Sequence, residues 1–231
     1  MNKELGLHQE LVLLSLNDST GNFESTMLTY GLAGAVLSEL MLRDRIAISS
    51  DDEKLVSVKL SRSTDDPILD EVLKNIEGAA KPASLNKWVT KTANIKDLAH
   101  RLASQLAEYG ILKKDEKKVL WLFSKRVYPE LDSTYEDSIR KRMAALMFDD
   151  KAPVDEHIAV LVTFAKCTNT LAPNFARVEL QQHAKRIESI CNGDVLAGSA
   201  TQETIAAVQA AQMAAMIAST AAITAATVAT N

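Results

Sequence analysis

The chain has 231 residues, of which 47% are hydrophobic, with eight Gly, five Pro and a formal net charge of −4. A chain of this length can bury a substantial core, and the low Gly and Pro content favours a compact, mainly α-helical protein. The negative net charge argues against a protein that binds nucleic acid through phosphate contacts, because such proteins normally carry a basic excess.

Two features indicate a cytoplasmic protein. Cys167 and Cys191 lie far apart and form no CxxC motif, so we interpret both as reduced, buried residues. The apolar run Leu11–Leu14 is too short for a secretory signal, and polar residues 8–10 precede it directly. We therefore expect no export.

A first amphipathic helix is predicted over Leu5–Leu16 and ends before the polar turn at residues 17–22. The next stretch, Met27–Arg45, is apolar on all sides as far as Leu42, which predicts a buried central helix. It is too short for a membrane span and carries Glu39 near its end. We expect the other elements to pack around this helix as a single-domain helical bundle.

Two short strands joined by a turn are predicted over residues 45–60. Asp66 and Pro67 then form a typical helix start, with a capping side chain followed by a residue that suits the first helical position. This helix is expected to end at Gly78.

A short helix containing Trp88 is predicted over Ser84–Thr90, and Asn94 is expected to cap a longer helix that ends at residues 109–110. Residues 111–128 predict a second hairpin, with a charged segment at 113–118 and the apolar run 119–123 as a strand.

Three more helices are predicted over Ser133–Phe148, Val154–Cys167 and Asn174–Ile190. From Thr204 to the C-terminus the composition changes to Ala-rich and uncharged, with Ala recurring every three or four residues. Such a seam lets helices approach closely, which favours self-association. We therefore divide the chain into a domain at 1–195 and an Ala-rich helical tail at 196–231.

Catalytic and metal-binding motifs are absent from the sequence: it contains no GxSxG, GxGxxG, P-loop, HExxH or Cys/His metal spacing. The four histidines are isolated from one another and from the cysteines. We expect no enzymatic activity, no cofactor and no metal, although catalytic groups assembled only in space stay an open alternative.

The segment GLAGAVLSELMLRDRI (31–46) is similar to the pattern GLxGxxLxELxLRxRI of the Golgi phosphoprotein 3 family, the phosphatidylinositol-4-phosphate-binding adaptors and their bacterial relatives. ELGLHQELVLLSLND (4–18), ILDEVLKNI (68–76) and RLASQLAEYGIL (101–112) extend the resemblance. The resemblance implies a nearly all-helical single domain with small hairpins and no catalysis. It also implies a basic face that docks peripherally on a membrane by binding an anionic phosphoinositide headgroup.

The resemblance also identifies the headgroup positions in this chain. A Trp, one Arg and a pair of Arg in the lipid-binding members correspond here to Glu24, Ala33, Lys96 and Ala99. Only Lys96 keeps a positive charge, and a phosphomonoester needs several convergent donors. We therefore expect a divergent, bacterial-type member with weak and poorly selective headgroup binding.

The apolar run in the second hairpin supports a membrane-contacting interpretation. Basic residues flank it on both sides, Trp suits the headgroup zone, and the corresponding hairpin contacts membrane in the lipid-binding relatives. The proposed contact residues are Lys118, Val119, Leu120, Trp121, Leu122, Lys125 and Arg126. The alternative is a strand buried on both faces.

Two non-enzymatic functions follow from the sequence. The first is a cytoplasmic, peripherally membrane-associated protein that binds an anionic lipid, phosphatidylinositol 4-phosphate by family resemblance. The second is a soluble adaptor that binds a protein partner without recognising phosphoinositides. In both cases the hairpin and the Ala-rich tail are candidate contacts for a homo-oligomer, and no nucleic-acid partner is expected.

Overall fold

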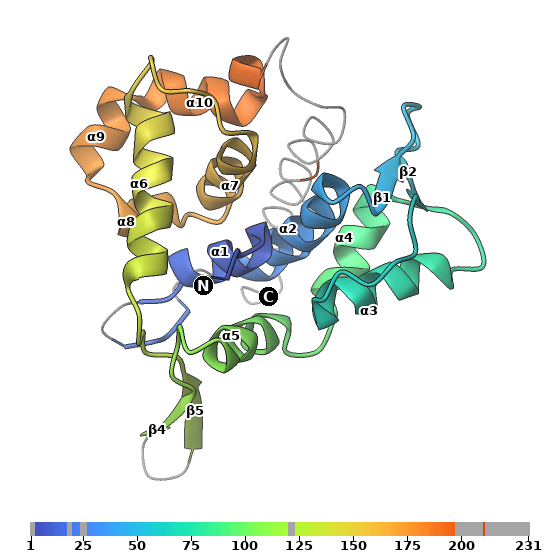
Figure 1. Cartoon of the computed structure of the whole chain (residues 1–231), viewed down its shortest axis with the longest axis horizontal. Helices are drawn as coiled ribbons and strands as arrows, with labels where there is room; N and C mark the ends of the chain where they lie inside the picture. Colours follow the sequence, from blue (N-terminus) through green and yellow to red (C-terminus); the bar gives the residue numbers. More distant parts are fainter. Residues whose placement is uncertain (1–2, 18–19, 24–26, 120–122, 197–209, 211–231) are drawn as a thin grey trace, which may run out of the picture.

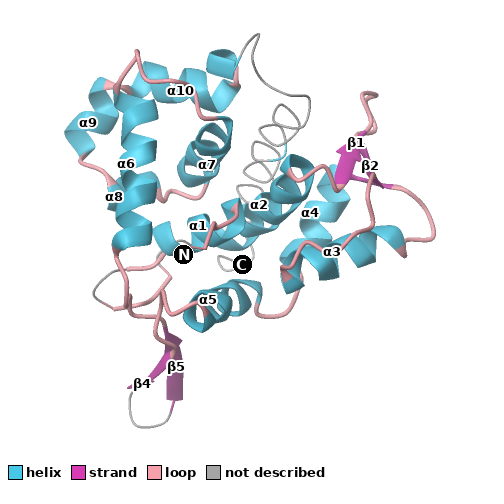
Figure 2. Cartoon of the chain, in the orientation of Figure 1, coloured by secondary structure: helices cyan, strands magenta, loops and turns pink. Residues whose placement is uncertain are grey.

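The computed structural model describes residues 3–17, 20–23, 27–119, 123–196 and 210. Within these residues the protein is mainly α-helical, with two small antiparallel sheets (Figures 1 and 2). This confirms the predicted fold class. Of the predicted tail at 196–231 only Leu196, which ends a 3-10 turn, and Ala210, which is helical, are described, and both are buried. The domain boundary at 195 therefore stays a prediction.

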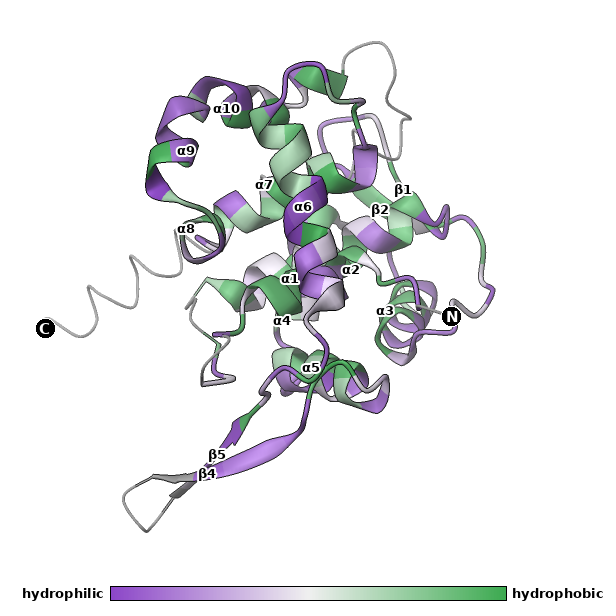
Figure 3. Cartoon of the chain, turned by 60° about the vertical axis from the view of Figure 1, so that its left-hand side comes forward, coloured by the Kyte–Doolittle hydropathy of each residue, from purple (hydrophilic) through white to green (hydrophobic). Residues whose placement is uncertain are grey.

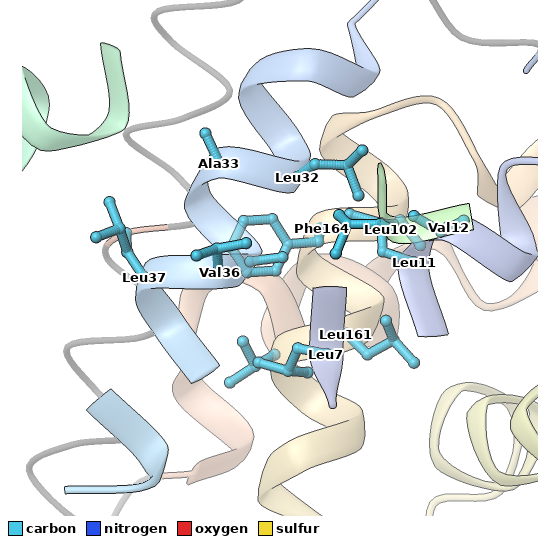
Figure 4. Close-up of a cluster of buried hydrophobic side chains, with 14 of the residues drawn as sticks. Leu7, Leu11, Val12, Leu32, Ala33, Val36, Leu37, Leu102, Leu161 and Phe164 are labelled. Carbon is cyan, nitrogen blue, oxygen red and sulfur yellow. The ribbon is translucent and has the colours of Figure 1, made fainter. Parts of the chain in front are cut away.

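The central helix is α2, Leu28–Leu42, as predicted. Four described helices and the first strand pack around it together with α1, Leu7–Leu14, all of whose residues are buried. Figure 4 shows how side chains from α1, α2, α5 and α7 meet in this core, with Phe164 between Val36 and Leu102. Because every residue of α2 from Gly31 to Met41 is buried, this part of the helix needs no polar face.

A glycine sets the distance between α2 and the end of α7. A Cβ at Gly31 would lie 2.1 Å from Cγ2 of Thr168, which is far closer than two carbon atoms can approach. The missing side chain of Gly31 therefore allows this close approach.

The first sheet contains β1, Ile46–Ile48, and β2, Leu55–Val58, as predicted, with Ile46 opposite Val58. A two-residue strand that was not predicted, β3 at Ala83–Ser84, pairs with the other edge of β2. In the sequence, α3 lies between β2 and β3 and runs over Pro67–Glu77. Its first turn is capped by Asp66, which accepts hydrogen bonds from the amides of Ile68 and Leu69.

The helix that contains Trp88 is α4, Leu85–Ala93, and it ends at Asn94. The prediction that Asn94 caps the next helix is therefore wrong. Helix α5 covers Leu98–Glu108, and its N-cap is Asp97, which lies in the left-handed region at φ 58°. The predicted C-terminus is confirmed, since Gly110 adopts φ 76° and the amide of Ile111 bonds back to the carbonyl of Leu106.

The second hairpin exists, but its strands differ from the prediction. Strand β4 is Asp115–Val119 and β5 is Phe123–Val127, so the charged segment forms a strand and the apolar run spans the connection between them. Val119 pairs with Phe123, and residues 120–122 lie outside the described residues. A two-stranded ribbon has two solvent-accessible faces, which explains why alternating burial did not mark β4.

Helices α6, Thr134–Phe148, and α7, Glu156–Cys167, match their predictions. The third predicted helix, Asn174–Ile190, is wrong as a single element. It is divided into α8, Leu171–Asn174, α9, Arg177–Gln182, and α10, Ala184–Asn192, which a short 3-10 turn at Asp194–Leu196 follows. Phe175 and Ala176 are extended and interrupt it. Helices α9 and α10 lie at the end of the molecule opposite the β4–β5 hairpin (Figure 1).

Candidate functional site

The β4–β5 hairpin projects from the helical body and is largely hydrophilic along its strands (Figure 3). Residues 113–127, which include both strands, contain six Lys or Arg and two acidic residues in a chain whose net charge is −4. Positive charge is thus concentrated on one projecting element. Such an arrangement attracts anionic partners although the whole protein is acidic.

The apolar run of the hairpin lies at its far end, between the last residue of β4 and the first residue of β5. The backbone of Lys118 and Val119 belongs to β4, and that of Lys125 and Arg126 to β5. The proposed contact residues Leu120, Trp121 and Leu122 lie outside the described residues. The register places the basic residues along the strands, and the two described ends of the apolar run, Val119 and Phe123, form the outermost described pair.

The base of the hairpin is attached to the segment that precedes α2. The amide of Tyr128 donates to the carbonyl of Gly21 at 2.8 Å, and Nζ of Lys117 donates to the carbonyl of Thr20 at 3.3 Å. Gly21 adopts φ 65°, and a Cβ there would lie 2.6 Å from the backbone of Tyr128. This close contact fixes where the hairpin leaves the body.

An aromatic cluster supports the same junction. The rings of Phe23, His100 and Tyr128 lie within 6.2 Å of one another, centroid to centroid. The hydroxyl of Tyr128 donates to the carbonyl of His100 at 3.2 Å. The cluster therefore joins the hairpin base to the first turn of α5.

A groove of about 500 Å³ lies between α5 and the hairpin base. We call it the hairpin groove. Its charged lining residues come from the turn before α5, from α5 itself, from the segment before β4 and from β5. They are Lys96, Asp97, Arg101, Glu108, Lys114 and Arg126, and His100 and Ser104 add further polar groups.

Two of the groove cations form ion pairs. Nη2 of Arg126 lies 2.9 Å from Oδ1 of Asp97, and Nη2 of Arg101 lies 2.5 Å from Oε2 of Glu71. The hydrogen bond from Arg126, with the charges of Arg126, His100 and Lys96, lowers the pKa of the Asp97 carboxyl. Asp97 is therefore ionised throughout the physiological range.

His100 lies in a positive environment. Its partial burial and the charges of Arg126 and Lys125 lower the pKa of the imidazole, and the charge of Asp97 opposes them only in part. Nδ1 of this ring is buried without a hydrogen-bond partner among the described residues. The ring is therefore mainly neutral at pH 7.

The four headgroup positions implied by the resemblance do not form one donor cluster. Glu24 lies outside the described residues, and Ala33 is completely buried in α2. Lys96 is exposed beside α5, and Ala99 is half-buried in its first turn. Only Lys96 of the described positions offers a donor, and it is also the one that lines the hairpin groove.

Charged residues in the core have structural partners. Asp66 accepts hydrogen bonds from His8 at 3.0 Å, from Gln9 at 3.2 Å and from Gln105 at 3.2 Å, in addition to the two amides of α3. Burial alone would raise the pKa of Asp66, but the bond and charge of His8 and the other donors outweigh it and hold the pKa well below its usual range. Asp66 thus joins α1, α3 and α5.

A second cavity of about 390 Å³ lies beside α1, α6 and the start of α7. Its wall includes Glu10, whose two carboxylate oxygens pair with Arg142 and with Nε2 of His157, the latter at 2.6 Å. Burial would lower the pKa of His157, but the bond and charge of Glu10 outweigh it, so the pKa is raised. These groups satisfy one another and link α1 to α6 and α7.

No cluster of three or more metal-binding side chains occurs in the part of the chain that the structure describes. The same residues include no helix with the length and hydropathy required to cross a bilayer. Cys167 and Cys191 form no disulfide in the described structure, and Cys191 is buried while Cys167 is partly exposed. Burial raises the pKa of the Cys167 thiol to about 11, so it is not an activated nucleophile.

Sequence reasoning identified the basic hairpin but missed the hairpin groove. The groove depends on Asp97 and His100 of α5 meeting Lys114 and Arg126 from a different part of the chain. The local signal was present only as basic residues on both sides of the apolar run. Their convergence with α5 is a tertiary feature that no spacing in the sequence encodes.

Comparison with known proteins agrees with the resemblance of the motifs. The family model for Golgi phosphoprotein 3 (GPP34) matches residues 7–208. The vacuolar protein sorting-associated protein 74 of Eremothecium gossypii is 29% identical over 164 residues, which are 62% of this chain and 49% of that protein. The protein of the same name from Schizosaccharomyces pombe is 28% identical over 172 residues, 65% of this chain and 50% of that protein.

The chain therefore spans about half the length of the curated relatives that it matches. The family match covers nearly all the described helices, including α2 with its GLAG segment and α5 with the following turn. A match of this extent shows the family. The chain belongs to the Golgi phosphoprotein 3 family.

Proposed function

We propose that this protein is a non-enzymatic peripheral membrane adaptor that binds an anionic lipid surface through the β4–β5 hairpin. Phosphatidylinositol 4-phosphate is the expected lipid by family resemblance. The observation that carries the proposal is the ribbon of two basic strands that projects from the body and whose outermost described pair, Val119 and Phe123, begins and ends the apolar run 119–123 of the sequence.

The physical basis is the combination of two weak attractions. Basic residues close to an anionic bilayer contribute about 1 kcal/mol each, and an aromatic and aliphatic tip is suited to the headgroup zone. Lys118 and Lys125 lie one and two residues from Val119 and Phe123, the outermost described pair of the hairpin. Neither attraction is sufficient alone, so the interaction is expected to be reversible.

Headgroup recognition is expected to be weak and poorly selective. A completely buried Ala33 cannot donate a hydrogen bond to a lipid, and Ala99 carries no polar group. These two positions also favour a second candidate, an adaptor that binds a protein partner without phosphoinositide recognition. In that case the Ala-rich tail at 196–231 is the proposed element of self-association.

The proposal is tested by sedimentation with vesicles of phosphatidylcholine alone, with added phosphatidylserine, or with added phosphatidylinositol 4-phosphate. Leu120→Asp combined with Trp121→Asp should abolish sedimentation with both anionic vesicles and leave the melting temperature nearly unchanged. Leu131→Asp is the matched control, because Leu131 is 61% exposed and lies outside the strands of the hairpin.

Undiminished sedimentation of the double variant would exclude the hairpin tip as the contact. Unfolding of the double variant would show that the apolar run is part of the core. A strong preference for phosphatidylinositol 4-phosphate over phosphatidylserine would contradict the weak headgroup site. If no vesicle binds and deletion of residues 204–231 lowers the mass measured by light scattering, the assembly adaptor is favoured.

A further inference from the structure

We propose that the cavity between α3 and α4 binds a small carboxylate with an apolar body, and that the indole N–H of Trp88 and the ammonium of Lys91 hold its carboxylate group. The cavity has a volume of about 290 Å³. It shares no lining residue with the hairpin groove. Binding at this place is therefore separate from the proposed membrane function and goes beyond it.

The cavity is lined on one side by the second half of α3 and the turn after it, and on the other by α4 and the turn after it. Both helices pack against α2 (Figure 1). Val72, Trp88 and Thr92 in the wall are almost fully buried, so the cavity reaches into the core. Asn75 and Lys91 are exposed and mark its opening. A buried wall with an open mouth is typical of sites for small molecules.

The indole of Trp88 is the main evidence for a ligand. Trp88 is 3% exposed, and its Nε1 atom is buried without a hydrogen-bond partner among the described residues. A buried indole N–H normally donates to an acceptor, because an unsatisfied buried donor destabilises the folded state. Since Trp88 also lines the cavity, an oxygen atom of a ligand there would supply the acceptor.

Lys91 adds a positive charge next to the same ring. Its Nζ atom lies 4.2 Å from the centroid of the Trp88 ring, and this cation–π contact holds the ammonium beside the cavity. No Asp or Glu lines the cavity, and Lys91 forms no ion pair with any described residue. An N–H donor and a cation without a facing acid together suit a carboxylate, which accepts charge-assisted hydrogen bonds.

The remaining wall determines the other part of the ligand. Val72, Ala79 and Ile95 provide aliphatic surface, and the ring of Trp88 provides an aromatic one. Burying an apolar body against them would contribute to the affinity in proportion to the area removed from water. A cavity of about 290 Å³ suits a carboxylate with a single ring or a branched aliphatic chain.

The experiment uses the full chain, with phenylacetate and 4-methylpentanoate as probes and calorimetry as the measurement. Two compounds are controls: 2-phenylethanol keeps the ring without the charge, and acetate keeps the charge without the ring. Phenylacetate should bind about tenfold more tightly than 2-phenylethanol, and acetate should not bind. Equal affinity for phenylacetate and 2-phenylethanol would overturn the preference for a carboxylate. Absence of binding by both probes would overturn the site.

The indole N–H of Trp88 provides a direct readout. The chain has two Trp residues, so Trp121→Phe leaves Trp88 as the source of the only indole signal in the NMR spectrum. A carboxylate that accepts a hydrogen bond from Nε1 should move this N–H resonance downfield. A resonance that stays in place while calorimetry shows saturation with phenylacetate would overturn the role of Trp88.

Lys91→Gln tests the charge. It should weaken binding of phenylacetate about tenfold and leave binding of 2-phenylethanol unchanged. Lys87→Gln is the matched control, because Lys87 is also exposed on α4 but does not line the cavity. Lys91 lies in the last turn of α4, where a cation also offsets the helix dipole. A lower melting temperature of Lys91→Gln with an unchanged preference for phenylacetate would show that this structural role is the only one.

Two further variants test the cavity itself. Trp88→Phe keeps an aromatic ring but removes the N–H, and it should weaken binding of phenylacetate about tenfold. Because the smaller ring leaves space in the core, circular dichroism checks the fold of this variant. Ala79→Leu at a partly exposed wall position narrows the cavity and should prevent binding of phenylacetate. Undiminished binding by folded Trp88→Phe and by Ala79→Leu would overturn the cavity as the binding site.

Discussion

Charged side chains are buried in one region, the core around α1, and exposed in another, the hairpin groove. Under α1, Asp66 and Glu10 are almost fully buried, and each carboxylate is held by donors from other helices. In the groove, exposed cations outnumber the acids that face them. Burial forces charges to be paired, so the core charges are explained by folding, whereas the exposed charges of the groove are solvated and need no fixed partner.

Replacing the central acid of the core should have the largest effect. Asp66→Ala removes the cap of α3 and leaves His8, Gln9 and Gln105 without their shared acceptor. Breaking a buried pair of this kind typically costs about 3–5 kcal/mol. The measurement is the free energy of unfolding from urea denaturation.

Asp97→Asn in the hairpin groove is the variant to compare with Asp66→Ala. Asp97→Asn should change the free energy of unfolding far less than Asp66→Ala does, because its ion pair with Arg126 is exposed. Asp52→Ala, in an exposed turn, controls for simple loss of an acidic residue. Similar losses for Asp66→Ala and Asp97→Asn would remove the distinction between the two regions.

Lowering the pH should also reveal the role of the buried Asp66 in stability. The folded-state pKa of Asp66 is depressed, so the stability that it contributes is present above the pKa of the unfolded state, near 3.8, and is lost as the pH falls below it. The free energy of unfolding of Asp66→Ala should therefore depend less on pH in this acidic range than that of the unchanged chain.

Packing rather than charge determines the next effect. Gly31→Ala places a methyl group against Cγ2 of Thr168 and should destabilise the protein by about 1–3 kcal/mol. Thr168→Ser removes that methyl group and keeps the hydroxyl that donates to the carbonyl of Phe164. The double variant should recover part of the loss in a denaturation cycle. Strict additivity would show that the clash is relieved elsewhere.

The smallest expected effect is a difference between the pKa values of two histidines. His157 in the core should titrate above 6.5 and His100 in the groove below it, because Glu10 favours the charged form of His157 while Arg126 and Lys125 disfavour that of His100. NMR titration measures both. A single common pKa would contradict the electrostatic contrast between the regions.

Glu10→Gln tests whether Glu10 raises the pKa of His157. It should lower the pKa of His157 and leave that of His100 unchanged. Because the folded-state pKa of His157 is raised, its stabilising contribution is complete below about pH 6.5 and is lost as the pH rises through the folded value. Glu10→Gln should therefore make the free energy of unfolding depend less on pH above 6.5.

Sequence reasoning succeeded where local chemistry determines the structure. The apolar surface of α2 and the Asp66-Pro67 start of α3 are local signals, and both elements were predicted correctly. It failed at Asn94 because α5 begins at Asp97 in a left-handed conformation, which Asp adopts only in a suitable tertiary context. The hairpin groove was missed because its cations converge only after folding.

The strands of the hairpin illustrate a further reason for error. β-Propensity favoured the apolar run as a strand, but the pairing register places the charged residues 115–118 in β4. Burial usually marks a strand by alternation, and a ribbon that projects into solvent provides little burial. The position of the apolar run at the connection was therefore visible only in the folded structure.

The junction at Gly21 sets the direction in which the hairpin projects from the helical body. The amide of Tyr128 is hydrogen-bonded to the carbonyl of Gly21, and the ring of Tyr128 packs against Phe23 at the same junction. These contacts hold the base of the hairpin in one orientation relative to the helical body. Any surface that holds the tip determines the tilt of the helical body. Helices α9 and α10, at the opposite end, then face away from that surface, where a second molecule can reach them without steric interference (Figure 1).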